Sequence, residues 1–156
     1  MSPEEQTFLD QLRRVLTEKV APLAAETDET AQFVHRQLDT LADLGLMGAN
    51  LPTPYGPAIS AAALYAAVEA VAGACGSTAS ALTAHYLATD SLHLGADPAL
   101  QARFLPDAAA GTKLGAFALT ERNAGSDPAD MRTTATKQGD HYRLKGAKCF
   151  ISNGGV

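Results

Sequence analysis

The stretch from Phe117 to Gly155 decides the fold, because the pattern of the chain changes there from helical to extended. It opens with FALTERNAGSD, which ends at Asp127, and continues from Met131 with MRTTATKQGDHYRLKGAKCFISNGG. Apolar and polar residues alternate over much of it, and glycines interrupt it at short intervals. Such a pattern is typical of short strands joined by turns.

Three extended segments are expected in this region. The apolar run at 114–119 predicts a short strand that leads into a polar loop. Alternation at 131–137 and 142–145, on either side of a Gln-Gly-Asp turn, predicts a β-hairpin. A last strand is expected to begin at 148–152.

The residues before this region follow a helical period. Ser2 and Glu5 form a predicted capping box, and Pro22 is expected to bend the first helix near its end. A loop rich in proline covers 50–57. The predicted helices span residues 3–23, 29–44, 60–74, 78–94 and 98–105.

This order of elements predicts an α+β protein with two parts. Residues 1–112 are expected to form an all-helical bundle. Residues 113–156 are expected to supply the first strands of a β domain. No internal repeat is present.

Composition excludes several classes of protein. The net charge is −5 and no cluster of Lys and Arg stands out, which argues against nucleic-acid binding. No run approaches the ~20 apolar residues that cross a bilayer, and the acidic N-terminus lacks the core of a signal peptide. We therefore expect a cytoplasmic protein. Cys75 and Cys149 are isolated, and an inert buried thiol is favoured for each over a metal site.

The loop after the first predicted strand has two interpretations. Residues 124–127 could direct backbone N–H groups at one point, a nest for anionic or carbonyl oxygens, with the hydroxyls of Thr120 and Ser126 as further donors. Alternatively, Asn123, Asp127 and Pro128 suit an ordinary turn closed by a side chain. Taken alone, the composition favours the turn.

Other polar residues have plain interpretations. His85 and His93 lie eight positions apart on one predicted helix, which is not a metal-ligand spacing, and each is interpreted as a surface or satisfied helix residue. Glu69 is expected to be solvated. Glu121 beside the loop invites a role as general base.

Three motifs in this order resemble the flavin-binding region of the acyl-CoA dehydrogenase family. That family shows Thr-Glu-Pro-x-Ala-Gly-Ser-Asp, then Gly-Asp-x-Tyr-x-Leu-x-Gly-x-Lys, then Ile-Thr-Asn-Gly. The matching stretches begin here at Thr120, Gly139 and Ile151. The resemblance extends to Leu44–Gly56 and Phe104–Pro106, and so covers nearly the whole chain. It implies that residues 113–156 are the start of a truncated β domain, an incomplete β-barrel.

The chain also departs from the family pattern at a few positions. Arg122 replaces the usual proline, which loosens the backbone and adds a charge. Ser152 replaces threonine and keeps the hydroxyl, and Phe150 stands where tryptophan is frequent.

The resemblance implies FAD as cofactor and assigns contacts to it residue by residue. Thr120 would bond to the pyrimidine side of the flavin ring, Phe150 would pack near the ring, and the Ser152 hydroxyl would face the reactive flavin nitrogen. Phe117 and Ser126 would also contact the acyl-CoA substrate. The full set of implied cofactor-binding residues is Phe117, Leu119, Thr120, Gly125, Ser126, Phe150, Ile151 and Ser152.

The resemblance further implies an activity, namely oxidation of acyl-CoA thioesters to trans-2-enoyl-CoA in fatty acid metabolism. Electrons would pass to an electron-transfer flavoprotein, and the complete enzyme would be a homo-oligomer, a homotetramer. The family places its catalytic carboxylate in a C-terminal helical domain, so Glu121 is interpreted as an anchor for the loop and no catalytic residue is assigned in this chain. No metal ligand is assigned either.

Two alternative functions stay open. A flavin monooxygenase or oxidase shares the scaffold, and a non-catalytic binding or assembly subunit could keep the fold without the chemistry.

Overall fold

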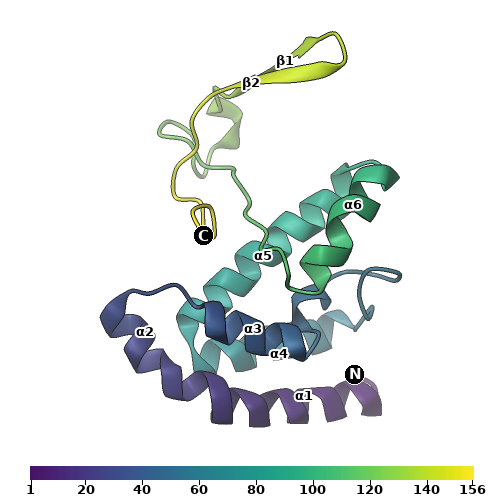
Figure 1. The fold of residues 1–156 in the computed structure, drawn as a ribbon, viewed down its shortest axis with the longest axis vertical. Helices are drawn as coiled ribbons and strands as arrows, with labels where there is room; N and C mark the ends of the chain where they lie inside the picture. The colour runs from purple at the N-terminus through teal and green to yellow at the C-terminus, as the bar shows by residue number, and fades with distance from the viewer.

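Six α-helices form the larger part of the molecule, and a two-stranded hairpin stands apart from them (Figure 1). The structure is a computed structural model that describes all residues, 1–156. The helices are α1 (Pro3–Val15), α2 (Ala24–Thr30), α3 (His35–Asp43), α4 (Ala61–Ala74), α5 (Gly76–Gly95) and α6 (Pro98–Ala109). The strands are β1 (Thr134–Gln138) and β2 (His141–Lys145). The predicted α+β class is confirmed.

The start of α1 is fixed by the predicted capping box. The Glu5 N–H donates to the Ser2 hydroxyl at 3.2 Å, and the Ser2 N–H donates to the Glu5 carboxylate at 2.7 Å. The same carboxylate accepts the Ser60 N–H at 2.6 Å, and Ser60 is the N-cap of α4. Glu5 therefore satisfies free amides at the starts of two helices.

Pro22 shapes the end of the first helical run. The path continues beyond α1 as a π-helical turn at Leu16–Val20 and a 3-10 turn at Ala21–Leu23. Proline lacks an N–H and its ring crowds the preceding turn, so the regular hydrogen-bond ladder is disturbed around Pro22. The predicted bend is confirmed.

The second predicted helix, 29–44, is wrong at its start. Helix α2 ends at Thr30, and Ala31 adopts a left-handed conformation with φ 52°. Helix α3 begins only at His35. The helical period was real, but the left-handed residue breaks the backbone hydrogen-bond ladder that the period assumed.

The core lies between α1, α3, α4 and α5. Leu9 and Leu12 of α1 are fully buried, as are Leu41 of α3 and Leu82 of α5. Small residues such as Ala67 let α4 approach its neighbours closely. This apolar burial is the main favourable contribution to the stability of the helical part.

The segment after α3 is attached to α5 by polar contacts. The buried Tyr86 hydroxyl donates to the Leu46 carbonyl at 2.5 Å, and burial raises the pKa of that hydroxyl. The Asn50 amide donates to Thr89 and Asp90 of α5 at 2.9 and 2.7 Å. These bonds hold α5 in a fixed position, and α5 in turn carries the residues that contact the C-terminal region.

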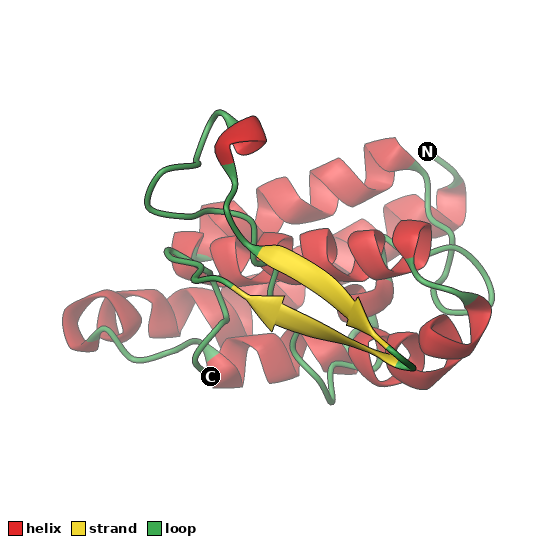
Figure 2. Cartoon of the chain, turned by 90° about the horizontal axis from the view of Figure 1, so that it is seen from above, coloured by secondary structure: helices red, strands yellow, loops and turns green.

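The β-hairpin has the predicted turn. Strands β1 and β2 are antiparallel, with Thr134 opposite Lys145 and Gln138 opposite His141. Gly139 takes a left-handed φ of 63° in the two-residue connection. Every residue of both strands is exposed, and no helix covers them (Figure 2).

The other two predicted strands are wrong. Residues 114–119 and 148–152 form no strand, although the Cys149 N–H donates to the Thr120 carbonyl at 3.0 Å. A strand is defined by a ladder of backbone bonds to a neighbour, and these segments share only that one backbone bond. The second segment is also interrupted at Phe150, whose φ of 57° is left-handed.

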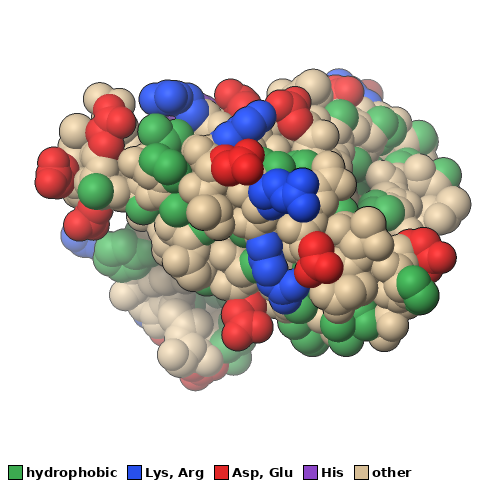
Figure 3. Space-filling model, turned by 90° about the horizontal axis from the view of Figure 1, so that it is seen from below, with side chains coloured by type: hydrophobic (Ala, Val, Ile, Leu, Met, Phe, Trp, Pro, Cys, Tyr) green, Lys and Arg blue, Asp and Glu red, His purple; other side chains and the backbone are tan.

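Charges of both signs alternate across the face of the molecule seen in Figure 3. Arg13 and Asp10 form an exposed ion pair at 3.0 Å. No helix of the molecule is both long enough and apolar enough to pass through a bilayer.

Candidate functional site

The first predicted contact segment, 115–121, leaves the helical part alongside α5. The Gly115 N–H donates to Nδ1 of His85 at 2.9 Å. Beyond this bond, Phe117 and Thr120 are half-buried and Leu119 is 37% exposed. The segment therefore keeps one side on the protein and turns the other outward.

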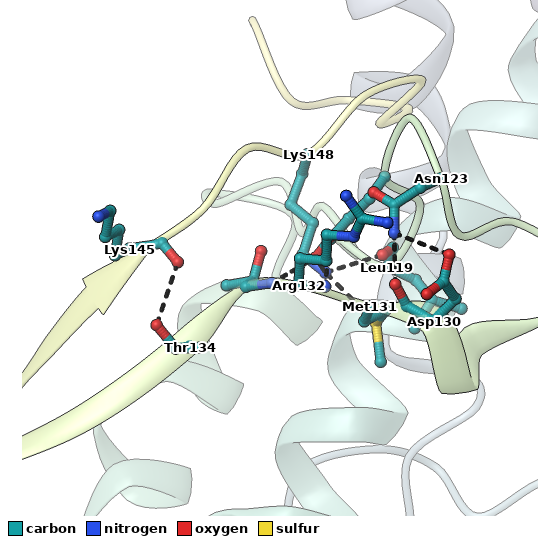
Figure 4. A network of polar contacts seen from close by, with 10 residues as sticks. Leu119, Asn123, Asp130, Met131, Arg132, Thr134, Lys145 and Lys148 are labelled. Carbon is teal, nitrogen blue, oxygen red and sulfur yellow. Dashed lines mark hydrogen bonds and ion pairs between the residues drawn. The ribbon is translucent and has the colours of Figure 1, made fainter.

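Glu121 anchors the loop that follows. Glu121 is only 6% exposed. Its carboxylate accepts hydrogen bonds from the N–H groups of Arg132 and Thr133 at 2.7 and 3.1 Å. Lys148 reaches it at 2.8 Å and donates also to the Leu119 carbonyl at 2.9 Å. Figure 4 shows Lys148 extending toward Leu119 and Met131. One carboxylate thus joins the loop, the start of the hairpin and the segment after it.

These contacts determine the charge state of Glu121. The Lys148 ammonium, followed by the Thr133 side chain and the Arg132 N–H, lowers the pKa of the carboxyl from 4.5 to about 2. A carboxylate that is paired and bonded in this way is a poor proton acceptor at neutral pH. The interpretation of Glu121 as an anchor is confirmed.

The tip of the loop has the predicted turn. The Asp127 side chain accepts the Ala129 N–H at 3.0 Å, and the Asn123 amide donates to the backbone and side chain of Asp130. Gly125 and Ser126 are exposed, and their amides donate to no backbone carbonyl. The turn and a set of free donors therefore coexist in the same loop.

The second predicted contact segment is a tight turn near the end of the chain. Phe150 is 92% exposed and, like Asn153, takes a left-handed φ, 57° and 64° respectively. Ile151 is half-buried, Ser152 is exposed, and the Gly154 N–H donates to the Ile151 carbonyl at 3.1 Å.

The structure brings the two segments together. The Cys149–Thr120 bond joins them directly, and the Asn153 amide donates to the carbonyls of Gly115 and Ala81 at 3.0 and 2.9 Å. Ala81 belongs to α5, so Ser152 is held beside that helix. A hollow of about 460 Å³ lies there between the start of α5, Phe33, Ser152 and Asn153.

Sequence reasoning missed the roles of His85 and Asn153. His85 is completely buried, so the expectation of a surface residue was wrong, although its Nδ1 is satisfied. An asparagine followed by two glycines does signal a left-handed turn. Nothing in the local sequence shows that its side chain reaches α5, 72 residues earlier.

The largest hollow lies elsewhere. It measures about 870 Å³ and lies between the start of α1, the loop 54–59 and the end of α6. It contains none of the predicted site residues. We place the candidate site along the two contact segments, which meet the hollow of about 460 Å³ at Ser152 and Asn153 and carry backbone amides without a carbonyl partner. No group of three or more His, Cys, Asp and Glu side chains is arranged to bind a metal ion.

The residues of the two contact segments fit a flavin. The amides of Phe117, Leu119 and Thr120 donate to no backbone carbonyl, and the Ser152 side chain is open to solvent. A flavin carries carbonyl and ring-nitrogen groups on one edge and a flat apolar ring, which match free amides, hydroxyls and an exposed Phe150. The chain thus offers polar and aromatic partners of the required kinds.

Known proteins place the chain in a family. Residues 2–112 match the model of the acyl-CoA dehydrogenase N-terminal domain, and residues 116–156 match that of the middle domain. The cyclohex-1-ene-1-carbonyl-CoA dehydrogenase of Syntrophus aciditrophicus (strain SB) is 37% identical over 100% of this chain. The match covers 38% of that relative, so the chain spans about two fifths of its length.

Solved structures agree with this assignment. The butyryl-CoA dehydrogenase of Megasphaera elsdenii is similar with a TM-score of 0.90 and 34% identity, over 99% of this chain and 42% of that one. An acyl-CoA dehydrogenase complexed with FAD from Bacillus anthracis is similar with a TM-score of 0.86 and 30% identity, over 97% of this chain and 27% of that one. The helical part, the incomplete sheet and both motif segments thus have one explanation: the chain belongs to the acyl-CoA dehydrogenase family.

Proposed function

We propose that the chain serves in the FAD-dependent oxidation of acyl-CoA thioesters to trans-2-enoyl-CoA, as one side of the flavin site. The observation that supports this most is the pairing of the two contact segments. Segments 115–121 and 149–153 are more than 25 residues apart in sequence, yet a Cys149–Thr120 bond and the Asn153 amide hold them together. Free amides and hydroxyls remain at their outer side.

Each predicted site residue has a role in this proposal. The backbone and hydroxyl of Thr120, with the Leu119 backbone, bind the pyrimidine edge of the flavin, while Gly125 permits close approach of the loop. Phe150 and Ile151 pack near the ring, and the Ser152 hydroxyl donates to its reactive nitrogen. Phe117 and Ser126 also contact the thioester end of the substrate.

The proposed reaction also needs FAD and a carboxylate base, neither of which we assign to a residue of this chain. FAD, when bound, supplies the two-electron acceptor for the hydride that leaves the β-carbon of the substrate. The α-proton needs a carboxylate base, and Glu121 is unsuited to this because its lone pairs are committed to Lys148 and two amides. This chain orients the flavin and one side of the substrate.

The names of the similar proteins support a CoA thioester as the substrate class, since both a cyclohexenecarbonyl-CoA and a butyryl-CoA dehydrogenase are among them. We further propose an electron-transfer flavoprotein as electron acceptor, a homotetrameric assembly, a cytoplasmic location and a place in fatty acid metabolism. These four points rest on family membership alone.

The test is an anaerobic single turnover. A protein that contains this chain and has been loaded with FAD should lose its flavin absorbance when butyryl-CoA is added, and electron-transfer flavoprotein should restore it. Butyrate without CoA is the matched control and should leave the spectrum unchanged. If the flavin is reduced only by a reductant other than acyl-CoA, and oxygen is then consumed, the protein would be a monooxygenase or oxidase. FAD binding without any reduction by a series of acyl-CoAs would favour a non-catalytic protein.

A further inference from the structure

Gly115 lies outside the three flavin motifs, and both its N–H and its carbonyl form hydrogen bonds to side chains. The Gly115 N–H donates to His85 Nδ1 at 2.9 Å, and the Gly115 carbonyl accepts the Asn153 amide at 3.0 Å. A Cβ at this position would lie 2.8 Å from the Ala88 Cβ and 3.3 Å from His85 Nδ1. The backbone of Gly115 therefore lies directly against α5, and a side chain would push it away.

The contact with His85 requires one form of the ring. Because Nδ1 accepts a hydrogen bond, the neutral ring must carry its proton on Nε2. His85 is fully buried, and burial lowers the pKa of the ring, while hydrogen bonding with the carbonyls of Met47 and Ala108 acts in the opposite direction. Nε2 meets no partner within strict hydrogen-bond geometry, so the bond from Gly115 is the one well-formed hydrogen bond of the ring.

The contact with Asn153 also requires one particular side chain, a primary amide. Its amide nitrogen donates both to Gly115 and to the Ala81 carbonyl of α5, so both of its hydrogens are used. The left-handed φ of 64° is a conformation that asparagine tolerates better than most residues. An aspartate would have the same shape but would present an acceptor to two carbonyls.

We propose that His85 and Asn153 are positioning residues that together set the spacing of the two flavin-contact segments through Gly115. Gly115 lies two residues before Phe117, and Asn153 directly follows Ser152. His85 and Ala81 both belong to α5, and they bind Gly115 and Asn153 respectively. The helix therefore fixes the positions of both segments. This proposal rests on the proposed function in one respect, namely that these segments face a flavin.

The proposal is tested on the chain itself by nitrogen-15 NMR. The wild type should show a coupling across the hydrogen bond between the Gly115 nitrogen and His85 Nδ1, and ring shifts of a neutral Nε2–H form. Absence of that coupling in the folded protein would overturn the proposal, whatever the variants do.

Variants then separate positioning from packing. His85→Leu keeps the bulk and removes the acceptor, and should raise exchange of the Gly115 and Cys149 amides by at least about tenfold. His85→Asn restores an acceptor oxygen near the Nδ1 position and should return both rates toward the wild type. Asn153→Asp should accelerate the Cys149 amide similarly. His93→Leu, the same change on the same helix, is the matched control and should alter neither rate.

The outcomes distinguish this proposal from the proposed function. If Gly115 exchange rises in His85→Leu or Asn153→Asp while Cys149 exchange does not, the two segments are independent and the proposal is wrong. If His85→Asn behaves as His85→Leu, the acceptor is irrelevant and the proposal is again wrong. None of these readouts involves flavin, so a failure of acyl-CoA to reduce the loaded protein would affect the proposed function alone.

Discussion

At the scale of single residues, Glu121 is the centre of the C-terminal region. It joins Arg132, Thr133 and Lys148, which lie in three different stretches of the chain. Its anchoring role could be inferred from the family resemblance, which places the catalytic carboxylate in another domain. The partners could not be inferred, since they depend on how the hairpin folds back over the loop.

Because Glu121 is bonded as a carboxylate, the free energy of unfolding should fall in acid. The pKa of Glu121 is lowered from 4.5 to about 2 in the folded chain, so its contribution is complete above about pH 4.5. It should be lost as the pH falls from 4.5 toward 2, because the unfolded chain takes up the proton first. Denaturant unfolding of Glu121→Gln should show a smaller loss in this range than the wild type. Glu69→Gln, on the exposed face of α4, controls for the change in charge; an equal reduction there would contradict this account.

Ser152 carries the second prediction at this scale, which belongs to the proposed function. Removing a hydrogen bond to a buried flavin nitrogen should cost on the order of 1–3 kcal/mol. In a flavin-loaded protein that contains this chain, Ser152→Ala should slow single-turnover reduction by acyl-CoA with little loss of bound FAD. Ser152→Thr keeps the hydroxyl and should reduce at a rate near that of the wild type. An unchanged rate in Ser152→Ala would remove Ser152 from the site.

At the scale of elements, periodicity predicted most helices, and the structure shows where it fails. Ser60 and Asp97 cap α4 and α6 as their sequences indicate. The break at Ala31 could not be predicted, because alanine favours helix and nothing in its local sequence indicates a left-handed conformation. Residues 114–119 have strand composition but no partner strand, and composition carries no information about pairing.

Two glycines at the ends of helical segments give a matched pair for mutation. Gly45 and Gly111 both take positive φ, 70° and 76°, so alanine at either should cost about 1–2 kcal/mol through the backbone. At Gly111 the new Cβ would also lie 2.5 Å from the Ala42 Cβ, whereas at Gly45 nothing lies within 4 Å. Crowding typically adds about 1–3 kcal/mol. Urea unfolding should find Gly111→Ala the less stable variant; equal stabilities would mean that the loop at Gly111 moves freely.

At the scale of the whole molecule, the two parts are held by different forces. The helices share a core of buried leucines, while both strands of the hairpin are exposed and depend on Glu121 and Lys148 for attachment. The α+β class could be predicted because the change from helical to alternating period is sharp. The division at residues 1–112 and 113–156 stays a prediction.

Hydrogen exchange should reveal this difference. Amides of α1, α4 and α5 should exchange slowly, at rates set by global unfolding, because they are bonded within a buried core. Amides of β1 and β2 should exchange much faster, since their ladder has no covering layer. A second measurement after dilution tests for pairing between chains, which an exposed strand edge can promote. Protection of the hairpin equal to that of the helices at every concentration would contradict this account.

The most direct test of the central claim is where FAD binds. The isolated chain provides one side of the site, so we expect no stoichiometric complex at micromolar FAD. With FAD at millimolar concentration, amide shifts of the nitrogen-15 labelled chain should cluster at 117–126 and 150–153. Glu121→Gln, which loosens the loop, should weaken those shifts. Shifts that cluster instead in the hollow between α1 and α6, tight binding at micromolar FAD, or no shift at saturation would each contradict the claim that these two segments face the flavin.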